Sequence, residues 1–179
     1  MPASNRSDEL IRLTYCSTAT FNSLEQSSGV EREVARILME SRRNNPRKEI
    51  GGVLHYGNGY FFQALEGRRQ DVNERYEKIV QDKRHRDVEL LAVHAVDERM
   101  FPDWSMKYVS VEARISDLLA EHGMDQFQPY QFDEDFCEQL IQCFVKQPNA
   151  DQGSPRQPGN REPESKAAGK PFWKRIFGG

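Results

Sequence analysis

Long apolar runs are absent from this sequence, and none approaches the roughly 20 residues that a membrane-spanning helix requires. The first ten residues, MPASNRSDEL, also lack the apolar core of a secretory signal. Only three cysteines occur (Cys16, Cys137 and Cys143), and their scattered positions favour reduced thiols over metal ligands. The net charge of −3 gives no general argument for nucleic acid as a partner. We therefore expect a soluble, cytoplasmic protein.

Motifs for hydrolysis and nucleotide binding are missing as well. The sequence contains no Gly-x-Ser-x-Gly, no P-loop and no glycine fingerprint of a dinucleotide site. The four histidines, His55, His85, His94 and His122, show no metal-like spacing. Because His55 and His94 are single histidines inside expected strands, we interpret them as ordinary packing or surface residues. No catalytic or metal-ligating residue is predicted.

One stretch, GGVLHYGNGYFFQALEG at residues 51–67, predicts two short strands around a tight turn. The turn is expected at residues 57–59, since Gly and Asn tolerate positive φ. On the second strand Phe61, Gln63 and Leu65 share one face, so a polar amide lies between two apolar neighbours. A buried amide is costly unless it is hydrogen-bonded. Gln63 therefore needs a partner.

Hydrophobic periodicity orders the remaining elements. Strands are expected at residues 10–17, in the hairpin, at 88–96 and at 104–109, and helices from a capping box at 28–31 to about Arg43 and at 71–81. The order β-α-β-β-α-β with an added fifth strand is the ferredoxin-like pattern of an α+β fold. In that pattern the helices cover one face and the first strand lies beside the third. Tyr15 and Gln63 are then expected on adjacent strands, while the fifth strand receives no predicted position.

Two segments carry apolar residues whose burial can be predicted. The strand VELLAVHAV at 88–96 is rich in apolar and β-branched residues, which predicts deep burial. The helix at 71–81 should bury a stripe formed by Val72, Tyr76, Ile79 and Val80.

Beyond residue 110 the character of the chain changes. Amphipathic helices are predicted at 113–122 and 133–146, and the apolar face of the second (Phe136, Leu140 and Phe144) either packs on the open face of the sheet or mediates self-association. Residues 147–170 are rich in Pro, Gly, Ser, Asn and charges, which predicts disorder. The closing PFWKRIFGG is cationic and aromatic; it is expected to be disordered, with docking on a partner or an anionic surface as the open alternative. We divide the chain into a domain at 10–110, a helical extension at 111–146 and a tail at 147–179.

Several hydrogen-bonding groups fall within the predicted domain, namely Tyr15, Asn44, Asn45, Gln63 and Trp104. Amides and phenols both donate and accept, and so they suit a flat heterocycle with mixed donors and acceptors. Each residue alone also has an ordinary explanation: core packing for Tyr15 and Trp104, a helix stop for the asparagines, and a bond to a neighbouring backbone for Gln63.

At this point the sequence resembles a known family. The segments LIRLTYCSTAT, SRRNNPRKEIGGVLHYGNGYFFQALEG, IVQDKRHRDVELL and FPDWSM, in this order, resemble the BLUF domain, a sensor of blue light that binds FAD. The resemblance covers residues 10–109. It implies that Tyr15 is a photoactive tyrosine and that Gln63 lies between this tyrosine and the flavin. It also implies cofactor contacts from Asn44, Asn45, Lys78, Asp82, Arg84 and His85, and a signalling role for Trp104 and Met106.

The same resemblance implies a light sensor without catalytic turnover, in which the amide of Gln63 changes its hydrogen bonds after light excitation. No enzymatic effector domain follows the predicted sensor, so we expect a downstream signalling partner in trans, and homo-oligomerisation. Two alternatives remain open on a ferredoxin-like fold. An acylphosphatase-like hydrolase would require an arginine in the loop CSTATFNS, which has none. A nucleic-acid-binding module would expose aromatic and basic residues on the sheet.

Overall fold

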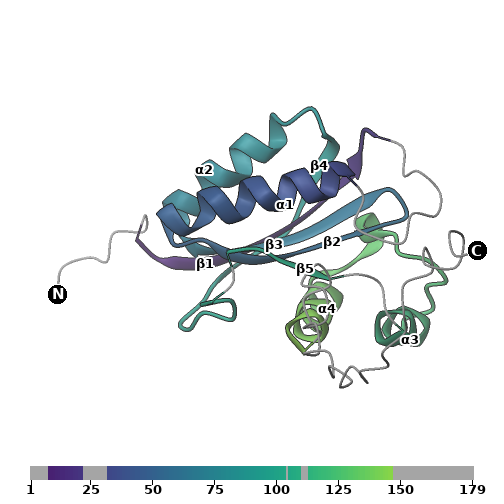
Figure 1. The fold of residues 1–179 in the computed structure, drawn as a ribbon. Helices are drawn as coiled ribbons and strands as arrows, with labels where there is room; N and C mark the ends of the chain where they lie inside the picture. The colour runs from purple at the N-terminus through teal and green to yellow at the C-terminus, as the bar shows by residue number, and fades with distance from the viewer. Residues whose placement is uncertain (1–7, 22–31, 104, 110–112, 147–179) are drawn as a thin grey trace, which may run out of the picture.

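The computed structural model describes residues 8–21, 32–103, 105–109 and 113–146. Five strands form one sheet in the order β4-β1-β3-β2-β5 (Figure 1). The strands are β1 (Leu10–Ala19), β2 (Gly51–Gly57), β3 (Tyr60–Arg68), β4 (His85–Ala95) and β5 (Lys107–Val109). β1 pairs antiparallel with β3 and β4, as the ferredoxin-like order requires, and the predicted α+β fold is confirmed.

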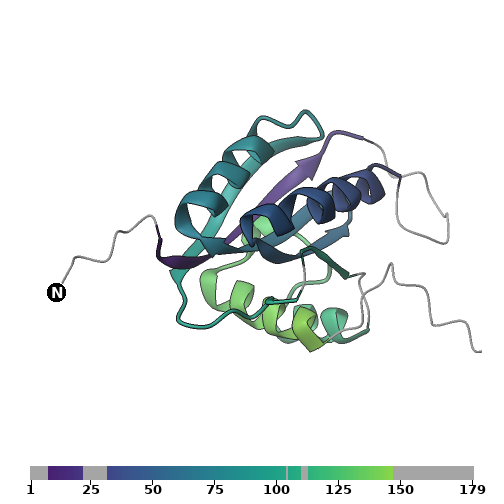
Figure 2. The same cartoon turned by 60° about the vertical axis from the view of Figure 1, so that its left-hand side comes forward.

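Helices lie on both faces of the sheet (Figures 1 and 2). The long helices are α1 (Arg32–Asn44), α2 (Arg69–Val80), α3 (Ala113–Glu121) and α4 (Glu134–Lys146), with short 3-10 helices at Asn45–Lys48 and Pro129–Gln131. α1 and α2 cover one face, as predicted, while α3 and α4 lie against the other. None of the helices in the described ranges combines the length and apolar character that a membrane crossing requires.

β5 occupies the position that the sequence did not assign. It pairs parallel with β2, with Val53 opposite Lys107 and His55 opposite Val109. It is shorter than the predicted strand at 104–109, and Trp104 lies outside the described residues. β5 is therefore an edge strand, next to β2 and one strand away from β3.

The predicted hairpin is confirmed, with a turn that is shorter by one residue. Asn58 and Gly59 have φ values of 53° and 80°, the left-handed pair that a two-residue hairpin turn needs. Gly57 still belongs to β2 and pairs with Tyr60. Phe61, Gln63 and Leu65 then share one face, as predicted.

Element boundaries agree with the sequence analysis to within a few residues. β1 continues two residues beyond the predicted end at 17, because Thr18 still pairs with Tyr60. α1 ends at Asn44, where Pro at the start of the following 3-10 helix breaks the α-helical hydrogen bonding. Its predicted capping box at 28–31 lies outside the described residues. At α4, Asp133 accepts from the Phe136 backbone N–H at 2.8 Å and so caps the helix.

The prediction of deep burial for the strand at 88–96 is wrong. β4 is an edge strand, and Leu90 and Val93 are 47% and 38% exposed. An apolar sequence of this kind suits a central strand, but β4 has a neighbouring strand, β1, at one of its two edges only. The predicted stripe on α2 needs a similar correction, since Val80 is 48% exposed at the end of the helix whereas Val72 is fully buried.

Two hydrophobic cores lie on opposite faces of the sheet. One joins α1 and α2 to β1 and β3 through residues such as Leu13, Leu38, Leu65 and Val72. The other joins α3 and α4 to the far face through residues that include Val53, Phe62, Phe136, Leu140 and Phe144. Of the two alternatives for the apolar face of α4, packing on the open face of the sheet is therefore the one observed.

Arg12 links α4 to the sheet through two ion pairs, one buried within the sheet and one partly exposed on α4. Arg12 on β1 donates to Glu66 on β3 at 3.2 Å and to Glu138 on α4 at 3.0 Å. Glu66 is fully buried and also accepts from the Phe101 backbone N–H at 3.1 Å. These bonds give the Glu66 charge the partners that it needs in a dry environment.

Candidate functional site

A pocket of about 190 Å³ opens between α1 and α2, over β1 and β3. Helix α1 and the residue after it contribute Ile37, Glu40, Ser41, Asn44 and Asn45; β1 and β3 contribute Tyr15, Gln63 and Leu65; α2 and the turn into β4 contribute Arg75, Lys78, Ile79, Asp82, Arg84 and His85. The lining combines apolar walls with amides, a phenol and charged groups. Such a lining suits a flat polar ligand.

Tyr15 and Gln63 form the floor of the pocket. They are paired directly across β1 and β3, and their exposed fractions are 0% and 2%. The Tyr15 hydroxyl donates to Gln63 Oε1. Gln63 Nε2 in turn donates to Met106 Sδ at 3.1 Å. The amide thus has both of its ends engaged, and its predicted need for a partner is met by Tyr15 and Met106.

Burial fixes the protonation state of this phenol. It raises the pKa of Tyr15 well above the ordinary value of 10.0, and the nearby Tyr76 and Asp82 raise it further. The ring of Tyr76 lies 5.6 Å from that of Tyr15. Tyr15 is therefore a neutral phenol at any physiological pH, with its proton held on the hydroxyl toward Gln63.

Two buried polar atoms of the pocket lack a partner within the described residues. Asn45 is fully buried, and its Nδ2 donates to the Ser105 carbonyl at 2.7 Å while its Oδ1 accepts from none of them. Arg75 Nε is also buried without an acceptor there. An acceptor and a donor left open in this way match a ligand that offers N–H and carbonyl groups. A flavin ring carries both, so the residues present fit FAD.

Part of the pocket lining consists of charged residues. Asp82 and Glu40 both pair with Arg84 Nη2 at 2.6 Å. Lys78 pairs with Glu74 at 2.7 Å on the exposed side of α2. These side chains place two cations beside the pocket, where they suit an anionic group such as a phosphate.

His85 closes the pocket beside Tyr15. Its Nδ1 lies 2.8 Å from Ser17 Oγ, and its ring centroid lies 4.5 Å from that of Phe61. Burial lowers the pKa of His85 to about 4, so the imidazole is neutral at pH 7. It therefore adds a hydrogen-bonding ring to the pocket wall but no charge.

The structure brings together nearly all residues singled out in the sequence. Tyr15, Asn44, Asn45, Gln63, Lys78, Asp82, Arg84 and His85 all line one pocket. Met106 is buried and reaches the pocket through its bond to Gln63. Trp104 lies outside the described residues.

Sequence reasoning missed Arg75 and Arg42. Arg75 lies three residues before Lys78 on α2, and this spacing places both side chains on one face of the helix. The spacing could therefore have identified Arg75 as a pocket residue. Arg42 Nε donates to the Met106 carbonyl at 3.0 Å. This contact depends on the position of β5, which no sequence pattern supplied.

The fold and the pocket define a ligand-binding domain of the ferredoxin-like class. A sequence profile of the family described as sensors of blue light using FAD, abbreviated BLUF, matches residues 10–107. The chain therefore belongs to the BLUF family, as its resemblance implied, and FAD is the cofactor of that family.

Similar proteins support the same assignment. The solved structure of BlsA in its photo-activated state is 30% identical with a TM-score of 0.71, over 78% of this chain and 97% of that one. Photoactivated adenylate cyclase subunit beta of Euglena longa is 38% identical over 106 residues, which is 58% of this chain and 11% of that protein. The blue light- and temperature-regulated antirepressor BluF of Escherichia coli (strain K12) is 33% identical over 69 residues, or 38% and 17% of the two chains. This chain thus spans only a small part of the curated relatives that it matches.

Proposed function

We propose that this chain is a blue-light sensor without catalytic turnover, and that it holds FAD in the pocket between α1 and α2. The observation that carries the proposal is the buried line of hydrogen bonds from Tyr15 through Gln63 to Met106. It joins the floor of the pocket on β3 to Met106, the residue before the edge strand β5. Asn45 and Arg75 would hold the flavin through their open hydrogen-bonding atoms, and Lys78 and Arg84 would face its phosphates.

FAD, when bound, supplies blue-light absorption and an excited state that draws an electron from a nearby phenol. Tyr15 is suited to the role of this phenol because its hydroxyl already donates its proton to Gln63 Oε1. If the Gln63 amide rotates, Nε2 faces Tyr15 and Oε1 faces Met106 Sδ. A carbonyl oxygen and a thioether sulfur are both acceptors, so the bond to Met106 is lost. The two orientations of the Gln63 amide would thus differ in the bond to Met106, the residue before β5.

The proposed output passes from β5 to α4. Met106 precedes Lys107, whose buried Nζ donates to the Phe144 carbonyl at 2.8 Å and to the Val145 carbonyl at 3.0 Å. These carbonyls belong to the last turn of α4, where a cation suits the helix dipole. Arg42 and Asn45 hold the preceding backbone from the pocket side. In this proposal a change at Met106 shifts Lys107 and so alters the contacts at the end of α4, which would act as the switching element.

A downstream protein in trans is the proposed recipient of this signal. The E. coli relative is named an antirepressor, which points to a repressor as its target. The Euglena relative is named a cyclase subunit, but the match covers 11% of it. We propose a protein partner, self-association and a cytoplasmic location for this chain, and no direct contact with nucleic acid.

An absorption spectrum tests the proposal. The purified protein, or the apoprotein reconstituted with FAD, should show a flavin spectrum that shifts slightly to the red under blue light and recovers in the dark. A protein that takes up no FAD, or a bound flavin whose spectrum is unchanged by light, would contradict it.

A further inference from the structure

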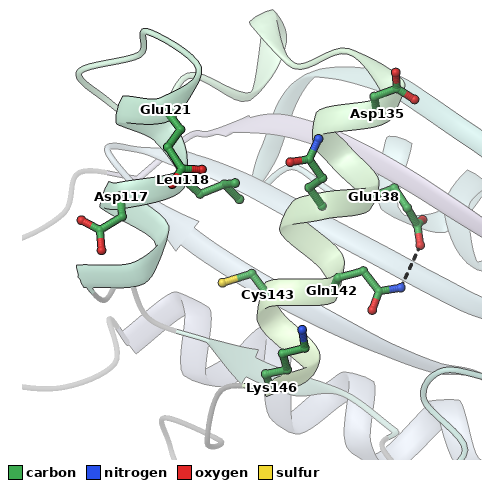
Figure 3. Close-up of a pocket in the computed structure, with 9 residues that line it drawn as sticks. Asp117, Leu118, Glu121, Asp135, Glu138, Gln142, Cys143 and Lys146 are labelled. Atoms are coloured by element: carbon green, nitrogen blue, oxygen red, sulfur yellow. Dashed lines mark hydrogen bonds between the residues drawn. The ribbon is translucent and has the colours of Figure 1, made fainter.

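A second cavity, larger than the flavin pocket, lies away from it. It is a groove of about 680 Å³ between α3 and α4, on the other side of the sheet (Figure 3). Its lining consists of Asp117, Leu118, Glu121, Asp135, Glu138, Gln139, Gln142, Cys143 and Lys146. Leu118 and Cys143 point toward each other across the groove and are half-buried (Figure 3). The proposed light response uses none of these side chains.

The rim of this groove is acidic. Four carboxylates and one cation, Lys146, line it. Glu138 is paired with Arg12 and accepts from Gln142 at 3.2 Å, a bond drawn in Figure 3. The other three carboxylates form no ion pair with any described residue. The groove thus offers a narrow apolar floor and uncompensated negative charge to whatever occupies it.

A complementary segment exists in the same chain. Residues 170–177, KPFWKRIF, carry three cations and no acid, and they lie outside the described residues. The apolar residues follow the spacing Phe172, Trp173, Ile176 and Phe177. Residues four apart lie on one side of a helix, so these four side chains can share a face that Lys174 and Arg175 flank. Such a face fits an apolar floor, and its flanking cations fit an acidic rim.

The length of the connection allows this segment to reach the groove. α4 ends at Lys146, which itself lines the groove, and 23 residues separate it from Lys170. A flexible chain of that length spans on average about 25–30 Å. The groove follows α4 from Asp135 to Lys146, about 17 Å at the rise of an α-helix. A tethered segment at this distance has an effective concentration near the millimolar range, which favours even a weak contact.

We propose that residues 170–177 bind in the α3–α4 groove of their own chain. The groove is then an internal docking site for an amphipathic cationic peptide, and the segment covers α4, the helix whose last turn accepts from Lys107. A protein partner that uses this groove must displace the segment. Docking of the segment and any conformational change of α4 are then thermodynamically linked. If the change in α4 alters the affinity of the groove for the segment, docking of the segment shifts the equilibrium of α4 by the same factor.

Disulfide trapping in the full-length chain tests the proposal, with Cys143 as the natural thiol in the groove. The other two cysteines, Cys16 and Cys137, are buried. Single cysteines are introduced in separate variants at Ser154→Cys and Gly178→Cys, which are 11 and 35 residues from Cys143. In a chain without docking, the shorter loop closes roughly sixfold faster under mild oxidation. Docking reverses this order, so Gly178→Cys should form the intramolecular disulfide faster.

Two further variants make the result specific. Lys174→Glu with Arg175→Glu, added to Gly178→Cys, should restore the order of a free chain, whereas Arg156→Glu with Arg161→Glu should leave the reversed order intact. Cys143→Ser should abolish trapping. Faster closure from Ser154→Cys, or a disulfide that forms mainly between two chains, overturns docking in cis. Because the disulfide is scored in the dark, its outcome is independent of the photocycle and separates this proposal from the proposed function.

Discussion

Tyr15 on β1 and Gln63 on β3 lie directly opposite each other in an antiparallel register, and the Tyr15 hydroxyl donates to the Gln63 side-chain carbonyl. Both side chains are buried on the face that α1 and α2 cover. Gln63 also donates to Met106. One amide therefore connects a phenol beside the pocket to Met106, the residue before the edge strand β5.

The first prediction concerns this connection. Tyr15→Phe and Gln63→Leu should each retain FAD but lose the reversible red shift under blue light, because Asn45 and Arg75 remain while the phenol–amide bond is gone. In Tyr15→Phe the Gln63 carbonyl is left buried without its donor, which should cost about 1–3 kcal/mol of unfolding free energy. Absorption spectra before and after illumination, with denaturant unfolding of each variant, give both readouts.

Tyr76→Phe is the matched control. The Tyr76 ring lies 5.6 Å from that of Tyr15. This variant therefore tests the loss of a nearby phenol that is not part of the hydrogen-bonded line from Tyr15 through Gln63 to Met106. The red shift should persist in this variant. A normal photocycle in Gln63→Leu would show that the amide is not the element that changes.

The second prediction concerns retention of the cofactor. Arg75→Met removes the buried donor that has no acceptor among the described residues, so apoprotein carrying this change should bind FAD about tenfold more weakly. Asn45→Ala should weaken FAD binding and also remove the hydrogen bond to the Ser105 carbonyl. Titration of apoprotein with FAD measures the affinity. Arg68→Met, at an exposed position before α2, should leave it unchanged.

Removing FAD should also lower stability. A ligand at 100 times its dissociation constant adds about 2.7 kcal/mol to the free energy of unfolding. That gain should shrink in Arg75→Met at the same FAD concentration. An equal gain in the wild type and in this variant would mean that Arg75 does not contact the cofactor.

The position of Tyr15 and Gln63 on adjacent strands could be predicted from the sequence, and the BLUF resemblance implied their contact. Gln63 interrupts an apolar strand face, and the element order places the first strand beside the third. Alternation then fixes the face on which each side chain lies, whereas the register that sets Tyr15 opposite Gln63 comes from the structure. Sequence patterns also placed Asn45 at a helix stop, and the BLUF resemblance implied its contact with the cofactor.

The contacts of β5 could not be predicted in this way. The Ser105 carbonyl meets Asn45 and the Met106 carbonyl meets Arg42 only because β5 pairs parallel with β2. A short strand after a turn carries no pattern that selects its neighbour. The exposure of Leu90 has a similar origin, since apolar content does not distinguish an edge strand from a central one.

The third prediction concerns the relay to α4. Lys107→Met removes the buried donor to the Phe144 and Val145 carbonyls, which should cost about 1–3 kcal/mol of stability. The red shift should persist because Tyr15 and Gln63 are unchanged. The difference in hydrogen exchange of the α4 amides between light and dark should diminish, since the bond from β5 to the helix end is gone.

The control is Lys146→Met, which replaces an exposed lysine at the same helix end and should retain the light response of α4. An undiminished response in Lys107→Met would rule out this route.

The fourth prediction is a pH dependence of stability that originates at His55. His55 Nδ1 lies 2.7 Å from the Val109 carbonyl. A carbonyl only accepts, so Nδ1 donates its proton, and Nε2 is buried without a partner among the described residues. The rings of Phe127 and Phe144 lie 4.5 and 5.5 Å away. Burial in this apolar surrounding lowers the pKa of His55 to about 4 from its ordinary value of 6.5.

Between pH 6.5 and pH 4 the unfolded chain therefore binds a proton at this residue that the folded chain does not. The contribution of the neutral, buried His55 to the free energy of unfolding is fully present above about pH 6.5. It falls as the pH is lowered, by about 2 kcal/mol at pH 5.0 for each such histidine. His85, whose pKa is also lowered to about 4, contributes with the same sign.

Denaturant unfolding at pH 7.5 and 5.0 measures the summed loss of stability from the two histidines, and His55→Phe should remove about half of it. The exposed His122→Asn serves as the control. If the pH dependence of His55→Phe equals that of the wild type, His55 is already protonated in the folded state or does not titrate in this range.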